Sequence, residues 1–356
     1  MTTSENAFHG LAAVLSSRDN KVLEIEIIPS SLGSSFLQDG CSIGITKKAL
    51  VQAFTIARQL FIKRLMPMSD DDFQLELLEK RTDSASISGP PITEIMLLFD
   101  CEHLTACNWR KRRLLAAVSH CLKVSDQVPL MIHMLETELT LLASYQCSPL
   151  HRHTKSPTLW SHRLWVLGQL FLIRSFNSEE LLKLERAELD IVLRAGELHP
   201  KNYYAFNYMR RLHLLLANTS TDVTDCVSWT VELARILINP TLDWCLANPR
   251  DISGWAFGKY LLEQVPEQQV RGESVSRALR FARDVGWEGE SLWTFVDHTV
   301  RHFDLETVVD EVFYQDKDDT EPEYPTTQAD APKWPWKTRL ARAKGYWVSY
   351  GQNNVQ

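Results

Sequence analysis

Two groups of residues have types that could hold a metal ion. The acidic run Asp70–Asp72 could share magnesium with a diphosphate, but sites of that kind use the spacing Asp-Asp-x-x-Asp and these acids are contiguous. They follow Ser69 and fit the acidic first turn of a capped helix. His151, His153 and His162 could also ligate a metal, but no Cys-x-x-Cys or His-Glu-x-x-His motif accompanies them. We therefore expect no metal on this chain.

A second kind of chemistry is indicated by residues 199–211, which read His-Pro-Lys-Asn-Tyr-Tyr-Ala-Phe-Asn-Tyr-Met-Arg-Arg. Amines, guanidiniums and phenols gathered at a helix start could bind anionic groups or a partner protein. The plainer alternative is that Pro200 and Asn202 only begin a helix. The sequence shows no phosphate-binding glycine loop and no Gly-x-Ser-x-Gly nucleophile motif. We therefore expect no self-contained catalytic centre.

Composition narrows the class of protein. The chain has 356 residues, of which 44% are hydrophobic and 23% charged, as in an ordinary globular protein. A net charge of −7 gives no basic excess, so nucleic acid is not an expected partner. No apolar run is long enough for a membrane span, and the N-terminus lacks the layout of a signal peptide. Seven cysteines without regular spacing suggest reduced thiols and a cytoplasmic location.

The elements that must position these residues are mostly helices. Leu23–Ile28 alternates like a short strand, whereas Gly40 and Gly44 indicate a loop. Residues 46–65 have a helical pattern, and residues 93–315 continue as one helix after another. Within them, segments 184–195 and 205–216 predict an antiparallel helix pair joined through the turn at 197–201.

We expect three parts. Residues 1–92 form an N-terminal segment of mixed structure that ends in a polar Gly/Pro loop at 82–92. Residues 93–314 form the helical body. Residues 315–356 comprise an acidic linker at 315–333 and a tryptophan-rich helix at about 336–350 that docks through Trp336, Tyr346 and Trp347.

The helical body repeats itself. Aligning large residues near helix starts gives five related positions at separations of 53, 46, 49 and 38 residues: Cys107, Trp160, Phe206, Trp255 and Trp293. A period in the forties is typical of helix-pair repeats, whose apolar faces are buried by stacking. We therefore predict an all-α superhelix, or solenoid, of about five repeats, in which Trp160, Phe206 and Trp255 are core residues.

Two stretches of these repeats are similar to the signature of a known family. They are His-Pro-Lys-Asn-Tyr-Tyr-Ala-Phe at 199–206 and Leu-Trp-Ser-His-Arg-Leu-Trp at 159–165. Residues 93–300 resemble the repeats of protein prenyltransferase α subunits, those of the farnesyl- and geranylgeranyltransferases. The long N-terminal segment and acidic linker are most similar to the divergent, α-subunit repeat-containing branch.

The resemblance implies a function shared with a second chain. In that family the α subunit is a crescent of helix pairs around a β subunit, an α/α barrel that holds the catalytic zinc and the isoprenoid pocket. The pair transfers a farnesyl or geranylgeranyl group from its diphosphate to a cysteine of an acceptor protein. The resemblance thus implies a β-subunit partner, prenyl diphosphate and acceptor protein in the complex, and zinc on the β subunit only.

The resemblance also implies roles for individual residues. Lys155 matches the family's lysine at the pocket mouth, where a cation can stabilise the departing diphosphate, although Pro157 replaces the usual tyrosine two residues later. Tyr203 would support the same side. Further interface residues would be Lys201, Asn202, Tyr204, Arg163 and Arg210, although Arg163 could instead pair within its own repeat. The third copy departs from the family in having Phe206 for tryptophan and Met209 for arginine, and the fourth has Gly258 at that arginine position.

Two functions remain open from the sequence. One is the α-type subunit of a protein prenyltransferase. The other is a non-enzymatic helical-repeat adaptor that binds a protein partner on the same kind of surface. The divergent residues Cys107, Pro157, Phe206 and Met209 favour some departure toward the adaptor.

Overall fold

The computed structural model describes residues 3–18, 20–33, 35–69, 71–72, 91–121, 128–150, 152–218, 226–314 and 340–341. The chain divides into two compact units, Met1–Leu215 and Leu216–Gln356. The domain boundaries predicted at 92/93 and 314/315 stay predictions. Most of the loop 82–92, the linker 315–333 and the docking helix 336–350, with Trp336, Tyr346 and Trp347, lie outside the described residues.

The first unit begins with a helix and a small sheet. Helix α1 (Thr3–Ser16) precedes strands β1 (Glu24–Ile28), β2 (Phe36–Asp39) and β3 (Ser42–Thr46), which are followed by α2 (Lys47–Leu60) and the short π-helical segment η2 (Phe61–Leu65). The strand order is β1-β3-β2, with β1 parallel and β2 antiparallel to β3. The predicted strand Leu23–Ile28 is thus confirmed as β1.

The loop expected around Gly40 and Gly44 is wrong, because these residues belong to a β-hairpin. Gly40 has φ 56°, which suits the turn between β2 and β3. Gly44 lies within β3 opposite Glu26 and Leu37. A Cβ at residue 44 would come within 2.9 Å of the Ile28 side chain, so the close approach there requires glycine.

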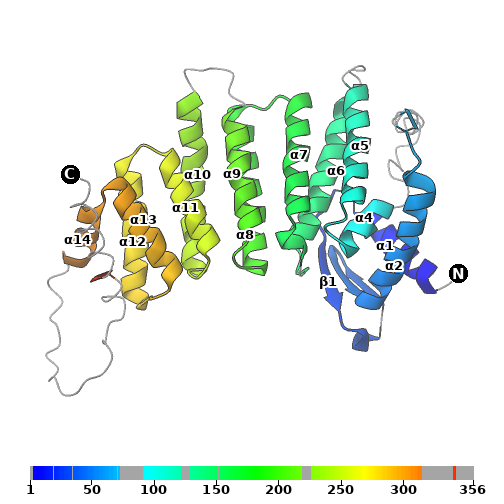
Figure 1. Cartoon of the computed structure of the whole chain (residues 1–356), viewed down its shortest axis with the longest axis horizontal. Helices are drawn as coiled ribbons and strands as arrows, with labels where there is room; N and C mark the ends of the chain where they lie inside the picture. Colours follow the sequence, from blue (N-terminus) through cyan, green and yellow to red (C-terminus); the bar gives the residue numbers. More distant parts are fainter. Residues whose placement is uncertain are drawn as a thin grey trace. The chain divides into compact units, whose positions relative to one another are not determined.

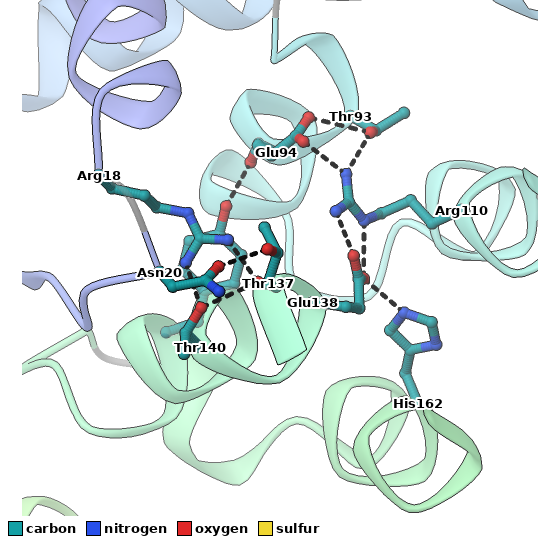
Figure 2. A network of polar contacts seen from close by, with 10 residues as sticks. Arg18, Asn20, Thr93, Glu94, Arg110, Thr137, Glu138, Thr140 and His162 are labelled. Carbon is teal, nitrogen blue, oxygen red and sulfur yellow. Dashed lines mark hydrogen bonds and ion pairs between the residues drawn. The ribbon is translucent and has the colours of Figure 1, made fainter. Parts of the chain in front are cut away.

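One edge of this sheet is closed by a helix of the body. The backbone N–H groups of Leu23 and Ile25 donate to the hydroxyls of Ser144 and Ser148, at 2.9 and 2.7 Å. Arg18 donates to the hydroxyl of Thr140 at 2.8 Å (Figure 2). The N-terminal elements are therefore bonded to the repeat helices, and an edge strand that could pair with another chain is covered.

The rest of the described chain is helical, as predicted (Figure 1). The helices are α4 (Ile92–Phe99), α5 (Leu104–Cys121), α6 (Val128–Gln146), α7 (Pro157–Ile173), α8 (Ser178–Leu198), α9 (Tyr203–Ala217), α10 (Cys226–Ala247), α11 (Ile252–Gln264), α12 (Gln268–Val285), α13 (Glu290–Phe303) and α14 (Glu306–Tyr314). Within the described residues, none of the helices is both long and apolar enough to span a membrane.

The helices pack as two-helix repeats. In the first unit, α5 contacts both α6 and α7, and α6 contacts α8. In the second unit, α11 contacts α10 and α13, and α12 contacts α10 and α14. Several of these helices thus meet both a neighbour in sequence and the next helix but one, as stacked helix-pair repeats do. The predicted all-α fold of helix-pair repeats is confirmed.

The five aligned positions take one structural place. Each is the fourth residue of its helix, and each is buried: Cys107 in α5, Trp160 in α7, Phe206 in α9, Trp255 in α11 and Trp293 in α13. In four of the five copies this side chain is a large aromatic, which packs the first helix against its neighbours. The core placement of Trp160, Phe206 and Trp255 follows directly from this position.

The helix starts share a capping rule. The residue four before each aligned position accepts a hydrogen bond from a backbone N–H of the first turn in four of the five copies: His103, Ser156, Asn202 and Asp251. Such caps satisfy donors that the helix itself leaves unpaired. The loops before α7 and α9, which carry the candidate site, are therefore held at their helix ends.

Candidate functional site

The loop before α7 places Lys155 next to a helix start. Lys155 ends a short 3₁₀ turn, η4 (His153–Lys155), and Ser156 caps α7 by accepting from Leu159 N at 3.1 Å. Pro157 is the first residue of α7, where a missing N–H costs nothing and the fixed φ suits the helix. The replacement of the family's tyrosine by Pro157 is therefore compatible with a regular helix start behind Lys155.

The loop before α9 is held by Asn202. This residue is fully buried; its Oδ1 accepts from Ala205 N at 3.2 Å, and its Nδ2 donates to Thr154 O at 2.7 Å. Asn202 thus begins the helix, as the plainer alternative holds, and also joins α9 to the loop before α7. Lys201 precedes it with φ 61°, a left-handed conformation that non-glycine residues seldom adopt.

Three side-chain bonds connect the two loops, which lie about 45 residues apart in the chain. Asn202 provides the first. The hydroxyl of Thr154 bonds to His199 Nδ1 at 2.8 Å, and Lys155 Nζ donates to Pro200 O at 2.8 Å. The loops before α7 and α9 are therefore bonded to each other, which the repeat alignment alone did not show.

The two bonded loops present basic and aromatic side chains to solvent. Tyr203 and Tyr204 are 59% and 49% exposed, Lys201 is exposed and Lys155 is half-buried. We call these four residues the basic–aromatic surface. Ammonium groups can stabilise phosphate or carboxylate oxygens, and phenols can donate to the same oxygens or pack against a partner. The structure thus brings together four of the residues that the sequence predicted for the site.

The predicted interface residues Arg163 and Arg210 lie elsewhere. Arg163 is buried, and its guanidinium donates to both carboxylate oxygens of Glu188 at 2.6 Å and to Leu139 O at 2.9 Å. This is the pairing within a repeat that the sequence left as the alternative. Arg210 is half-buried on α9. Any effect of Arg163 on a partner would pass through the packing of α7 against α8.

The sequence did not single out the acids that bind Arg163 and its counterpart in the first copy, Arg110. In the first copy, Arg110 Nε donates to Glu138 at 2.8 Å, Arg110 also pairs with Glu94, and His162 bonds to the same Glu138 at 2.7 Å (Figure 2). In the second copy, Arg163 and Tyr208 bind Glu188 in the same way. The two networks follow one rule. The arginine, Arg110 or Arg163, lies three residues after an aligned position. It shares its acid with the polar side chain two residues after the next aligned position, which is His162 or Tyr208.

The electrostatics of the first network follow from burial and charge. Burial alone would raise the pKa of Glu138, but the Arg110 guanidinium and the bond from His162 hold that pKa well below its usual range. Burial likewise opposes the charged form of His162, yet its hydrogen-bond partners raise its pKa above the ordinary value. The network therefore favours an ionised Glu138 between the Arg110 guanidinium and the His162 imidazole.

The arginine position of the third copy and the polar position of the fourth copy hold apolar residues. Met209 stands at the former and Phe257 at the latter, and both are fully buried. The acids of α10 whose side chains are described, Glu232 and Asp243, form exposed pairs with Arg235 and Arg277. These copies therefore do not keep the residue types that bind the acid in the first two networks.

The histidines and acids considered for metal binding have other places. His153 Nε2 bonds to Leu97 O at 3.0 Å, and His162 binds Glu138. Asp72 and Ser69 exchange hydrogen bonds at a helix start, as the sequence predicted. His151 and Asp70 lie outside the described residues. Across the part of the chain that is described, no group of three or more His, Cys, Asp or Glu could hold a metal ion.

Comparison with known proteins bears on the same region. The family model "Protein prenyltransferase alpha subunit repeat" matches residues 185–216, from within α8 to near the end of α9. "Protein prenyltransferase alpha subunit repeat-containing protein 1" of Homo sapiens is 25% identical over 196 residues, which are 52% of this chain and 42% of that relative. The chain thus matches less than half of the relative's length. The resemblance indicated by the repeat motifs is confirmed: residues 185–216 match the protein prenyltransferase α-subunit repeat, and the chain is similar to an α-subunit repeat-containing protein.

Proposed function

We propose that this chain is the α-type subunit of a heterodimeric protein prenyltransferase. Its partner would be a β subunit, an α/α barrel that holds the zinc and the isoprenoid pocket. The complex would transfer a farnesyl or geranylgeranyl group from a prenyl diphosphate to a cysteine of an acceptor protein. The chain itself would supply the support for the diphosphate and the surface for the partner.

The observation that carries this proposal is the basic–aromatic surface. Lys155, Lys201, Tyr203 and Tyr204 come from two repeats, and three side-chain bonds hold their loops together. Two ammonium groups beside two exposed phenols suit the mouth of a pocket in which negative charge develops on a departing diphosphate. The α-subunit repeat matched at 185–216 contains three of the four residues.

The first experiment asks whether a β subunit binds. The full-length chain is co-expressed with farnesyl- and geranylgeranyl-type β subunits, purified through a tag on this chain, and assayed for transfer of a labelled prenyl group to a cysteine-containing acceptor peptide. We expect a stable complex and transfer that ceases when zinc is removed by a chelator. Failure of every β subunit to bind would reject the proposal.

The second experiment tests the surface within that complex. Lys201→Asn removes the charge while keeping a residue that tolerates φ 61°. Tyr203→Phe removes only a hydroxyl. We expect each change to reduce transfer about tenfold with the complex intact, the loss for one charge-assisted contact. Lys183→Gln is the control, because Lys183 is exposed on α8 and pairs with Glu179. Equal activity of all three variants would contradict the role of the surface.

The adaptor function has one observation in its favour. The third copy has lost both the repeat's tryptophan and its arginine, at Phe206 and Met209. An adaptor would bind a protein through the same basic–aromatic surface without supporting chemistry. A β-subunit complex without transfer, together with loss of that complex in Tyr203→Ala, would favour this second function over the first.

A further inference from the structure

A single backbone carbonyl recurs as a hydrogen-bond acceptor in the repeats. It belongs to the residue six before each aligned position, in the turn that leads into the first helix. In the three copies with tryptophan, the indole Nε1 donates to this carbonyl of its own loop: Trp160 to Thr154 O at 2.8 Å, Trp255 to Pro249 O at 3.1 Å and Trp293 to Trp287 O at 2.9 Å. The tryptophan therefore fastens its own loop as well as filling the core.

Two copies lack tryptophan, and their side chains at the aligned position, Cys107 and Phe206, do not make this bond. Their carbonyls are nevertheless bonded. Ser156 Oγ donates to Cys101 O at 3.2 Å, and Lys155 Nζ donates to Pro200 O at 2.8 Å. Both donors come from adjacent residues of the second copy. The same carbonyl position thus receives a donor in all five copies.

We propose that Lys155 is a positioning residue that replaces the missing indole of the third copy. Its ammonium fastens the loop before α9 from the neighbouring repeat, through the Pro200 carbonyl. This role goes beyond the proposed prenyl transfer, because it concerns how the chain holds its own loop and applies whether or not a β subunit binds.

The conformation of the loop gives this bond its importance. Pro200 is followed by Lys201, whose φ of 61° is unfavourable for a residue with a Cβ. Such a conformation persists only where the surroundings hold it. The Lys155 bond acts on the carbonyl directly before Lys201, and the Asn202 bond to Thr154 O acts directly after it. The two bonds together hold the backbone that presents Tyr203 and Tyr204.

The residue that donates to this carbonyl also decides whether the hydrogen bond lies within one repeat or joins two repeats. An indole fastens a loop within one repeat, whereas Lys155 and Ser156 connect the second repeat to the third and to the first. An ammonium has three N–H groups, so one bond to Pro200 O leaves others for an anion or water. An anion could therefore bind the same Lys155 ammonium that fastens the loop.

Hydrogen exchange of the full-length chain tests this role. Lys155→Met keeps most of the length but has no donor, and Lys155→Arg keeps a donor. We expect backbone amides of residues 201–204 to exchange about tenfold faster in Lys155→Met, the factor for one lost hydrogen bond, and at the wild-type rate in Lys155→Arg. Lys183→Met is the control for loss of a surface lysine and should leave this loop unchanged. Equal exchange of residues 201–204 in the Met and Arg variants would overturn the proposal.

A rescue variant separates this role from a general effect on stability. Phe206→Trp supplies an indole at the fourth residue of α9, where three of the other four copies have one. In that background, Lys155→Met should no longer accelerate exchange at residues 201–204. Persistence of the full acceleration in a folded Phe206→Trp variant would overturn the proposal. If the larger side chain prevents folding, the comparison of Lys155→Met with Lys155→Arg decides alone. Neither readout depends on a β subunit, so failure here is distinct from failure of the proposed function.

Discussion

At the scale of residues, the first unit contains two buried acids, each of which binds an arginine and a second polar side chain. Glu138 binds Arg110 and His162, and Glu188 binds Arg163 and Tyr208. Each acid draws its partners from different helices, so the geometry of the pair depends on the packing of the repeats. A buried pair adds little net stability when compared with apolar residues, but breaking it leaves an unpaired charge.

The Arg163–Glu188 pair yields a prediction about stability. Glu188→Ala should lower the free energy of unfolding by about 3–5 kcal/mol, because the Arg163 charge remains buried without its carboxylate. The double variant Arg163→Met with Glu188→Leu should be much less destabilised, since no unpaired charge is left at this site. Urea unfolding followed by tryptophan fluorescence measures both. A double variant as unstable as Glu188→Ala would contradict this explanation.

At the scale of elements, the helix starts decide where the candidate site lies. A capping side chain four residues before each aligned position fixes the first turn of α5, α7, α9 and α11. Two of these caps also donate to a carbonyl of another repeat: Asn202 to Thr154 O and Ser156 to Cys101 O. The caps of α9 and α7 therefore each fasten two repeats together.

The two bonds of Asn202 predict unequal costs for two substitutions. Asn202→Ser keeps a cap acceptor and should cost about 1 kcal/mol of unfolding free energy, the usual value of the lost bond to Thr154 O. Asn202→Ala should cost about 2 kcal/mol, because the cap and the bond to Thr154 O are both lost. Thermal or urea unfolding of the two variants makes the comparison, and equal losses would contradict it.

At the scale of the whole molecule, the two units differ in how they hold charge. The first unit contains the fully buried networks around Glu138 and Glu188. In the described part of the second unit, the ion pairs Arg235–Glu232 and Arg277–Asp243 are exposed to solvent, and the pair Arg301–Asp297 is half-buried. Exposed pairs contribute little to stability and are screened by salt.

Acid should therefore affect the two units differently. Glu138 has a folded-state pKa below its unfolded value, so its contribution to stability is present above the unfolded pKa of about 4.3 and is lost as pH falls toward the folded pKa. Between about pH 5 and pH 3, the first unit should lose stability faster than the second. Hydrogen exchange in urea, followed on peptides from each unit, measures the two losses.

Glu138→Gln provides the matched control for the acid experiment. This variant cannot ionise at residue 138, so its first unit should be less stable at neutral pH but should lose less stability on acidification. The second unit of the same molecule reports any general effect of acid. An identical pH dependence of the first unit in wild type and Glu138→Gln would show that another group is responsible.

Much of the fold could be predicted from local patterns. Three patterns depend on residues that are close in sequence: the alternation at Leu23–Ile28, the apolar period of residues 205–216 and the five aligned positions. At these places the structure has strand β1, helix α9 and the first helix of each of the five repeats. The β2–β3 hairpin was missed because its glycines serve a turn and a close strand contact. Apolar periodicity also did not mark the two acids Glu185 and Glu188, which belong to the buried face of α8.

The sequence by itself determined the repeat period, the helical class and the residues that begin α7 and α9, because spacing, capping and apolar periodicity act over a few residues. Only the tertiary structure decided which of those residues meet. Lys155 reaches Pro200, Asn202 reaches Thr154, and a buried acid such as Glu188 lies between two repeats. These bonds join residues 20 to 48 positions apart, and they form only when helix stacking brings the loops together. For that reason the basic–aromatic surface belongs to the packing of two repeats and to no single motif.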